Sequence, residues 1–312
     1  MTATSDLTVA PVTALTGVAV PSLDPGSSAW LETMSASKVA AALGLSPYES
    51  PFSLWHRMAG RLTTDETDPR LQRGHYLEAG VVAWFADQHP DWLIQPGGSW
   101  AHPDQPRHTA SPDRLLHFPS GEIRGLEVKT AADDDEWGLP GTDEIPVGYR
   151  VQVLWQMYVL GTRITHVAVL SAYLEMREYV VPYDETEIDL IRTRAQEFLD
   201  TLPGGRATQR PSIDSHHQTY EAIRRLHPLI DGSDVELDPE TARQYCHARA
   251  QLKTATDAET YAKSLVADEL GLGKRARFNG STIASRQAKG DDGVPYVVAG
   301  RHLPTFDHED SA

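Results

Sequence analysis

The chain has 312 residues, of which 40% are hydrophobic and 8% aromatic, as in a globular protein with one large domain or a core domain and an appendage. Its single cysteine, Cys246, excludes an internal disulfide and any zinc or iron–sulfur site built from several cysteines of one chain. No apolar run reaches transmembrane length and no basic signal-peptide start is present, so we expect a cytoplasmic protein without membrane contact. The net charge of −16 argues against a uniformly basic surface, but it allows a local basic groove beside an acidic metal site.

The amino-terminal part of the chain predicts a tail followed by three helices. Residues 1–28 lack hydrophobic periodicity, which predicts a disordered tail. A helix is predicted from Ser35, a typical N-cap residue, to Gly44, and a second one over 51–60. A third helix is predicted over 69–88, because it has a proline at its first position and apolar residues along one stripe.

The third predicted helix carries a carboxylate, Glu78, on the stripe that also holds Val82 and Phe85. A carboxylate on a core-facing stripe is costly unless it is paired or binds a cation. An ion pair with a basic residue such as Arg73 and a role as metal ligand both satisfy this condition. We favour the ligand role, because the strands that follow offer further acidic ligands.

Strands and helices alternate over the rest of the chain. Strands are predicted at 92–95, 98–102, 109–118, 123–130, 167–172 and 177–182. Helices are predicted at 147–160, 184–202 and 238–270, and Asn279-Gly280 predicts the turn of a hairpin. The expected organisation is therefore a tail (1–28), a core (29–202), a linker or irregular cover (203–235) and a carboxyl-terminal helix and hairpin (236–304).

Residues 108–129 are the most informative segment. Asp113 precedes a short apolar run, a Pro-Ser-Gly turn follows, and a second run ends in Glu127-Val128-Lys129. In a hairpin, Asp113 would lie near Glu127 and Lys129, which share one face because alternate strand residues point the same way. Two carboxylates suit Mg²⁺, and a neighbouring lysine can polarise a water. The motif alone also fits a solvated strand with an ordinary ion pair.

Five sequence blocks, in order, resemble the YqaJ-type viral recombinases, relatives of lambda exonuclease in the PD-(D/E)XK nuclease superfamily. The blocks are Met34–Lys38 with Gly44–Pro51, Arg73–Glu78, Ala110–Asp113, Gly125–Ala131 and Tyr149–Gly161. The resemblance implies an α/β fold with a mixed central sheet flanked by helices. It also implies a deoxyribonuclease that resects duplex DNA ends from 5′ to 3′ for single-strand-annealing recombination. The alternatives are another PD-(D/E)XK nuclease, such as an endonuclease or a RecB-like enzyme, and a catalytically inactive DNA-binding or scaffold protein on the same fold.

The resemblance also implies roles for individual residues. Two Mg²⁺ ions, or Mn²⁺ in their place, would be held by Asp113, Glu127 and Glu78 with the Val128 carbonyl beside them. Lys129 would orient or activate the attacking water. The remaining roles are Gln152 next to the scissile bond, and Ser37 and Ser111 near a terminal 5′-phosphate.

Two positions depart from the family pattern. Residues 30–34 lack the arginine that family members usually carry, and Leu154 stands where a second glutamine is common. Lys38 could supply the missing cation of the phosphate pocket. Further contacts with DNA are expected from Arg73, Arg114, Arg150, Gln156, Lys274, Arg275 and Arg277. The expected partners are duplex DNA ends, a single-strand annealing protein, and further copies of the chain in a ring such as a trimer.

Overall fold

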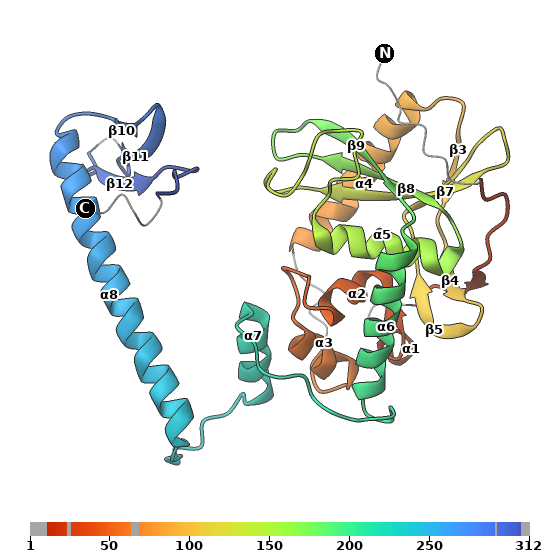
Figure 1. Cartoon of the computed structure of the whole chain (residues 1–312), viewed down its shortest axis with the longest axis horizontal. Coiled ribbons are helices and arrows are strands. Elements are labelled where there is room, and N and C mark those ends of the chain that lie inside the picture. Colours follow the sequence, from red (N-terminus) through yellow and green to blue (C-terminus); the bar gives the residue numbers. More distant parts are fainter. Residues whose placement is uncertain (1–10, 24–25, 64–68, 291, 307–312) are drawn as a thin grey trace. The chain divides into compact units, whose positions relative to one another are not determined.

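The computed structural model describes residues 11–23, 26–63, 69–290 and 292–306 (Figure 1). The chain divides into two compact units, Met1–Ile230 and Asp231–Ala312. The first unit contains two sheets and the helices that cover them, and the second contains one long helix and a small sheet.

A five-stranded mixed sheet forms the centre of the first unit. Its order is β3 (Leu93–Pro96), β6 (Arg114–His117), β7 (Ile123–Thr130), β8 (Ile164–Leu170) and β9 (Met176–Pro182). Strands β7 and β8 are parallel, whereas the other neighbours are antiparallel. Helix α4 (Pro69–Gln88) covers one face and α5 (Val147–Leu160) the other (Figure 1). The expected α/β fold with a mixed central sheet is confirmed.

The helices on the α5 side complete the larger hydrophobic core. They are α2 (Ala36–Ala42), α3 (Pro51–Met58) and α6 (Glu185–Thr201), preceded by the short helix α1 (Ser28–Leu31). The predicted bounds of α4 and α5 match the structure, and Gly161 ends α5 with a φ of 81°, a conformation that favours glycine. The Asp68 position before α4 lies outside the described residues.

A second sheet shows that the tail prediction is wrong for part of residues 1–28. Strand β1 (Val18–Val20) pairs with β4 (Ser99–His102), which continues to β5 (Gln105–Ala110) and β2 (Met34–Ser35). Thr16 N also donates a 2.9 Å hydrogen bond to Leu160 O. A three-residue strand has too little periodicity to be recognised in the sequence. Residues 1–10 lie outside the described part of the chain.

The single strand predicted at 109–118 is two strands in different sheets, and this prediction is wrong. Strand β5 ends at Ala110 and β6 begins at Arg114. Pro112 lies between them and has no N–H for a ladder, so the chain leaves one sheet and enters the other. The backbone of Gly97 packs against this turn, where a Cβ would lie 1.8 Å from Pro112 O. The break places Asp113 immediately before β6.

Residues 203–235 contain a helix, α7 (His217–Leu226), that belongs to the first unit rather than to a linker. Thr219 is buried, and its hydroxyl donates a 2.7 Å hydrogen bond to the hydroxyl of Ser50 at the start of α3. The prediction of a linker or irregular cover is therefore wrong for this helix.

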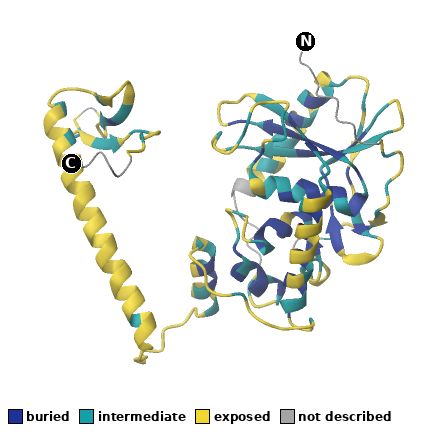
Figure 2. Cartoon of the chain, in the orientation of Figure 1, coloured by how far each residue is buried: buried dark blue, intermediate teal, exposed yellow. Residues whose placement is uncertain are grey.

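The second unit consists of α8 (Pro239–Leu270) and the antiparallel strands β10 (Arg275–Phe278), β11 (Ser281–Gln287) and β12 (Tyr296–Ala299). Asp238 caps α8 through hydrogen bonds to the backbone of Glu240 and Thr241. Asn279 and Gly280 form the predicted turn, both with positive φ. No residue of α8 is buried, in contrast to the core of the first unit (Figure 2). Within the described residues, no helix is both long enough and apolar enough to span a membrane.

Candidate active site

The β6–β7 hairpin brings the predicted carboxylates together. Arg114 pairs with Leu126 in the antiparallel ladder, so Asp113, one residue before the strand, lies opposite Glu127. Leu126 and Val128 pack into the core on the α4 side, and Glu127 and Lys129 therefore point toward α5. The hairpin and its two faces are as predicted from the sequence.

Glu127 is the most firmly held side chain of the site, and it is only 3% exposed. Its Oε1 accepts hydrogen bonds from Lys129 Nζ at 2.5 Å and from Gln152 Nε2 at 2.5 Å. Its Oε2 accepts one from Gln156 Nε2 at 2.7 Å. The two glutamines are four residues apart on α5, so they reach the carboxylate from one helix face. About four lone-pair positions exist on a carboxylate, and these three bonds leave one for a further ligand.

Asp113 is held by the backbone of the neighbouring strand. Val128 N donates a 2.7 Å hydrogen bond to Asp113 Oδ2. Burial is the largest influence and raises the pKa of Asp113 to about 7, with Glu127 adding to the rise and Lys129 opposing it. Two nearby carboxylates in a buried place repel each other, and a cation between them would relieve that repulsion.

Lys129 is the cation of the site. Burial lowers the pKa of this ammonium, but Glu127 and Asp113 raise it more, so the net shift is upward. The ammonium lies 5.0 Å from the centre of the Tyr149 ring, where a cation–π contact is favourable. The hydroxyls of Tyr149 and Tyr48 are 3.3 Å apart. Lys129 therefore stays charged and is fixed between a carboxylate and an aromatic face.

The site offers the carboxylates of Asp113 and Glu127, and carboxylate oxygens are the ligands that a hard divalent cation prefers. Glu78 is differently placed, because its Oε1 forms a 2.8 Å ion pair with Arg114 Nη1. Among the described residues, no three His, Cys, Asp or Glu side chains are grouped so that they could hold a metal together. The alternative weighed for Glu78, an ion pair with a basic residue such as Arg73, is the arrangement found, with Arg114 as the partner. The expected role of Glu78 as a third metal ligand is not supported by this arrangement.

Gln156 was predicted to contact DNA, and the structure places it elsewhere. It is 2% exposed, and its side-chain amide donates its hydrogen bond to the buried Glu127. The four-residue spacing from Gln152 was the signal in the sequence that both glutamines share one target.

A cavity of about 790 Å³ opens beside Gln152. Helix α2 and the loop after it line one side, and residues 130–137 with the start of α5 line the other. Its described lining includes the aromatic side chains of Tyr48, Trp137 and Tyr149. It also includes Asp133, Asp135 and Glu136, but no lysine or arginine. The local basic groove expected from the sequence is not this cavity.

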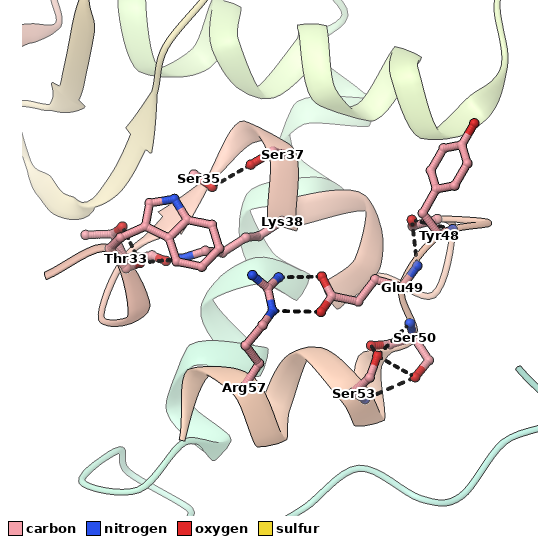
Figure 3. Close-up of polar contacts among 11 residues, drawn as sticks. Thr33, Ser35, Ser37, Lys38, Tyr48, Glu49, Ser50, Ser53 and Arg57 are labelled. Carbon is pink, nitrogen blue, oxygen red and sulfur yellow. Dashed lines mark hydrogen bonds and ion pairs between the residues drawn. The ribbon is translucent and has the colours of Figure 1, made fainter. Parts of the chain in front are cut away.

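The residues predicted to bind a 5′-phosphate make their hydrogen bonds with different neighbours and not with one another. Ser37 is exposed and its hydroxyl is 3.0 Å from that of Ser35, while the Ser111 hydroxyl is 2.9 Å from that of Ser99. Lys38 is 1% exposed, and its ammonium donates hydrogen bonds to the carbonyls of Trp30 and Thr33 (Figure 3).

The predicted contact of Lys38 with phosphate is not supported by this buried position. Burial is the main cause that lowers the pKa of Lys38 to about 6, and Arg57 adds to the effect. Figure 3 shows Arg57 directed instead at Glu49, with a bidentate hydrogen bond of 2.9 and 2.5 Å. Neither cation is available to a ligand at the surface.

The other predicted DNA contacts differ in accessibility. Arg150 forms ion pairs with Asp143 at 3.0 Å and Glu187 at 2.8 Å, so its charge is already neutralised within the fold. Arg73 is exposed. The basic residues of the carboxyl-terminal hairpin are exposed in the second unit, namely Lys274, Arg275 and Arg277.

Comparison with known proteins shows what the chain resembles. Residues 28–164 match the family described as the YqaJ-like viral recombinase domain. The chain is similar to this family over these residues. The β6–β7 hairpin, α4 and all of α5 lie inside the matched range. The "Uncharacterized protein YqaJ" of Bacillus subtilis (strain 168) is 27% identical over 239 residues, which cover 73% of this chain and 71% of that protein.

Solved structures similar to the chain include two exonucleases. An alkaline exonuclease (LHK-Exo) from Laribacter hongkongensis, also solved in complex with dAMP, is 22% identical. The match covers 55% of this chain and 88% of that one, with a TM-score of 0.43. A phage related exonuclease from Haemophilus somnus 129PT is 14% identical, over 54% of this chain and 94% of that one, with a TM-score of 0.41.

Proposed function

We propose that the domain containing residues 28–164 is a divalent-metal-dependent deoxyribonuclease that resects duplex DNA ends from 5′ to 3′. The observation that supports it most is the fixed placement of Glu127 between Lys129 and two glutamines, with Asp113 on the adjoining strand. In an ordinary solvated ion pair on a strand the carboxylate would stay exposed to water. Glu127 is instead buried and accepts hydrogen bonds from three donors. The similarity of residues 28–164 to a viral recombinase family agrees with this activity.

Asp113, Glu127 and the Val128 carbonyl are the residues that would hold Mg²⁺, or Mn²⁺ in its place. A bound divalent cation supplies a Lewis acid that offsets the charge developing on the phosphate oxygens. Lys129 holds a water by hydrogen bonding to its oxygen and orients it for attack on phosphorus. Gln152 and Gln156 hold Glu127 in one rotamer, because each donates a hydrogen bond to a different oxygen.

The cellular role follows from the product of such a reaction. Resection leaves a single strand, which a single-strand annealing protein would bind for recombination in the cytoplasm. Several copies of the nuclease around one duplex, as in a ring, would keep the enzyme on its substrate between successive cleavages.

The deciding experiment compares four substrates with the intact chain: linear duplexes labelled at the 5′ or the 3′ end, a 5′-hydroxyl duplex, and a closed circular duplex. Mg²⁺-dependent release of mononucleotides from 5′ ends is expected, with Asp113→Asn inactive and the exposed Asp104→Asn fully active as the matched control. Cleavage of the closed circle would show an endonuclease. Binding of DNA without any metal-dependent cleavage would show a non-catalytic DNA-binding protein and would end the proposal.

A further inference from the structure

Helix α8 is a 32-residue helix without a buried side chain in the described structure. Four large apolar side chains along it are about half exposed or more: Tyr245 at 65%, Leu252 at 56%, Tyr261 at 67% and Leu265 at 49%. In proteins, most helical stability comes from packing an apolar face against another element. The exposed length of α8 therefore lacks the contact that such a face normally makes.

The apolar face of α8 has an internal symmetry. Its residues recur at intervals of three and four, which places them on one side of a helix. They are Tyr245, Ala248, Leu252, Ala255, Ala258, Ala262 and Leu265. Counted outward from Ala255, each of these positions has a counterpart at the same distance on the other side. Gln251 and Glu259 lie in the same arc at equal distances from Ala255, whereas Tyr261 lies outside it. A second α8 in the opposite direction would place these apolar positions opposite one another and Gln251 opposite Glu259, and the alanines allow close approach.

The charges of α8 are divided between its two halves. Residues 239–254 carry three basic side chains and one acidic one, whereas 255–270 carry one basic and four acidic ones. This arrangement is unfavourable in a lone helix, because acidic residues such as Asp268 and Glu269 stand at the negative end of the helix dipole. An antiparallel neighbour of the same sequence would place each basic half beside an acidic half.

The ion pairs within α8 leave part of this charge unused. Arg243 pairs with Glu240 at 2.7 Å and Lys263 with Glu259 at 2.8 Å. Across the described part of the chain, no ion pair involves Arg249 in the basic half or Asp257, Asp268 and Glu269 in the acidic half. Arg249 borders the apolar face, one position after Ala248.

We propose that α8 is a self-association surface, which pairs antiparallel with α8 of a second copy of this chain about a two-fold axis near Ala255. In this register Ala248 lies opposite the partner's Ala262, and Arg249 comes beside the partner's Glu259, a carboxylate that it would share with the partner's Lys263. The pairing joins two nuclease units through their carboxyl-terminal helices. It goes beyond the proposed nuclease function and does not depend on it.

The direction of the pairing can be read by cross-linking, because the chain has one cysteine that can be removed. In full-length Cys246→Ser, the added change Ala255→Cys should give a covalent dimer under mild oxidation. Ala248→Cys should not, because antiparallel copies separate these residues by about 14 helical positions, or roughly 21 Å. A mixture of Ala248→Cys and Ala262→Cys chains should cross-link again. Cross-linking of Ala248→Cys with itself, or none by Ala255→Cys, would overturn the proposal.

The charge contact gives an independent check that leaves the apolar face unchanged. Arg249→Glu in the Ala255→Cys chain should reduce the cross-linking yield severalfold, and Glu259→Arg should do the same. The double change Arg249→Glu/Glu259→Arg should restore the yield. The two residues are ten positions apart in one helix, too far for a pair within it, so restoration requires a second chain. A double variant as weak as the single ones would contradict the register. Circular dichroism of each variant confirms that the helix is retained.

Discussion

Gln156 Nε2 donates a 2.7 Å hydrogen bond to Glu127 Oε2 at a place where both side chains are almost fully buried. The amide oxygen of Gln156 has no hydrogen-bond partner among the described residues. Leaving a buried oxygen unpaired costs free energy, and turning the amide over would bring that oxygen against a carboxylate. The orientation of Gln156 is therefore set by Glu127, which indicates that holding this carboxylate in place is its main role.

Replacing Gln156 with methionine keeps the volume of the side chain and removes its donor. We expect cleavage to fall by about 10- to 100-fold with a similar rise in the Mg²⁺ concentration needed, as is typical when a residue behind a metal ligand is lost. Gln196→Met is the matched control, because Gln196 Nε2 donates a 2.8 Å hydrogen bond to Asp200 away from the site. A metal titration of cleavage that coincides for Gln156→Met and wild type would contradict this role.

Lys129 can be tested for chemistry and for structure in the same experiment. Lys129→Met should slow cleavage by about 10²- to 10⁴-fold, in the range of a lost positioned catalytic group. It should also lower the free energy of unfolding by roughly 2–4 kcal/mol, because Glu127 loses the partner that compensates its burial.

Lys129→Arg separates the two effects. Arginine keeps the positive charge, so the free energy of unfolding should stay near that of wild type. The planar guanidinium cannot take the place of a compact ammonium beside the water, so the cleavage rate should remain low. Denaturant unfolding and single-turnover cleavage of both variants give the comparison. Full activity in Lys129→Arg would show that charge alone is required.

The raised pKa of Asp113, about 7, predicts a pH-dependent stability without metal. A carboxyl whose folded pKa exceeds its unfolded value contributes stability that is complete below the unfolded pKa and is lost as pH rises through the folded one. Asp113→Asn has no carboxyl to ionise, so it avoids this loss of stability. Its amide oxygen can still accept the hydrogen bond from Val128 N. Its unfolding free energy should match wild type near pH 4 and exceed it by roughly 1–4 kcal/mol at pH 8.

Thermal or urea unfolding in EDTA at several pH values measures the Asp113 effect. Asp104→Asn, an exposed change, should leave the pH profile of stability as it is. If Asp113→Asn were less stable than wild type at pH 8, the mutual repulsion of the two site carboxylates would not be the dominant influence.

End recognition gives a test of the phosphate pocket. Lys38 is turned toward the carbonyls of Trp30 and Thr33, so Lys38→Met should leave the ratio of cleavage rates on 5′-phosphate and 5′-hydroxyl duplexes unchanged. Ser37→Ala and Ser111→Ala, at exposed positions, are the informative comparison. A ratio that falls in Lys38→Met as much as in a serine variant would show that the ammonium leaves its buried position when DNA binds.

The parts of the fold that sequence predicts well are those with strong local signals. Helix α5 has a clear apolar pattern and a glycine stop, and β7 has the alternation that separates Leu126 and Val128 from Glu127 and Lys129. The hairpin that joins Asp113 to Glu127 followed from a turn between two short runs. These signals depend only on neighbouring residues.

The parts that sequence did not predict depend on contacts between distant residues. The pairing of Glu78 with Arg114 requires α4 and β6 to be packed, and no local pattern encodes that choice. Lysine is rarely buried, so Lys38 was expected to be free to contact a phosphate. In the structure its ammonium instead donates hydrogen bonds to two carbonyls from the preceding turn. Strand β1 is recognised only through its partner strand β4.

Helix α5 connects the site to the most protected part of the molecule. Val153, Leu154 and Met157 on this helix are 0% exposed, between the two glutamines that hold Glu127 and just after them. The helix cannot loosen locally without exposing these side chains to water, so its amide protons should exchange with solvent only when the first unit unfolds as a whole. The geometry around Glu127 should then survive up to the unfolding transition and vanish with it, rather than fade gradually on warming.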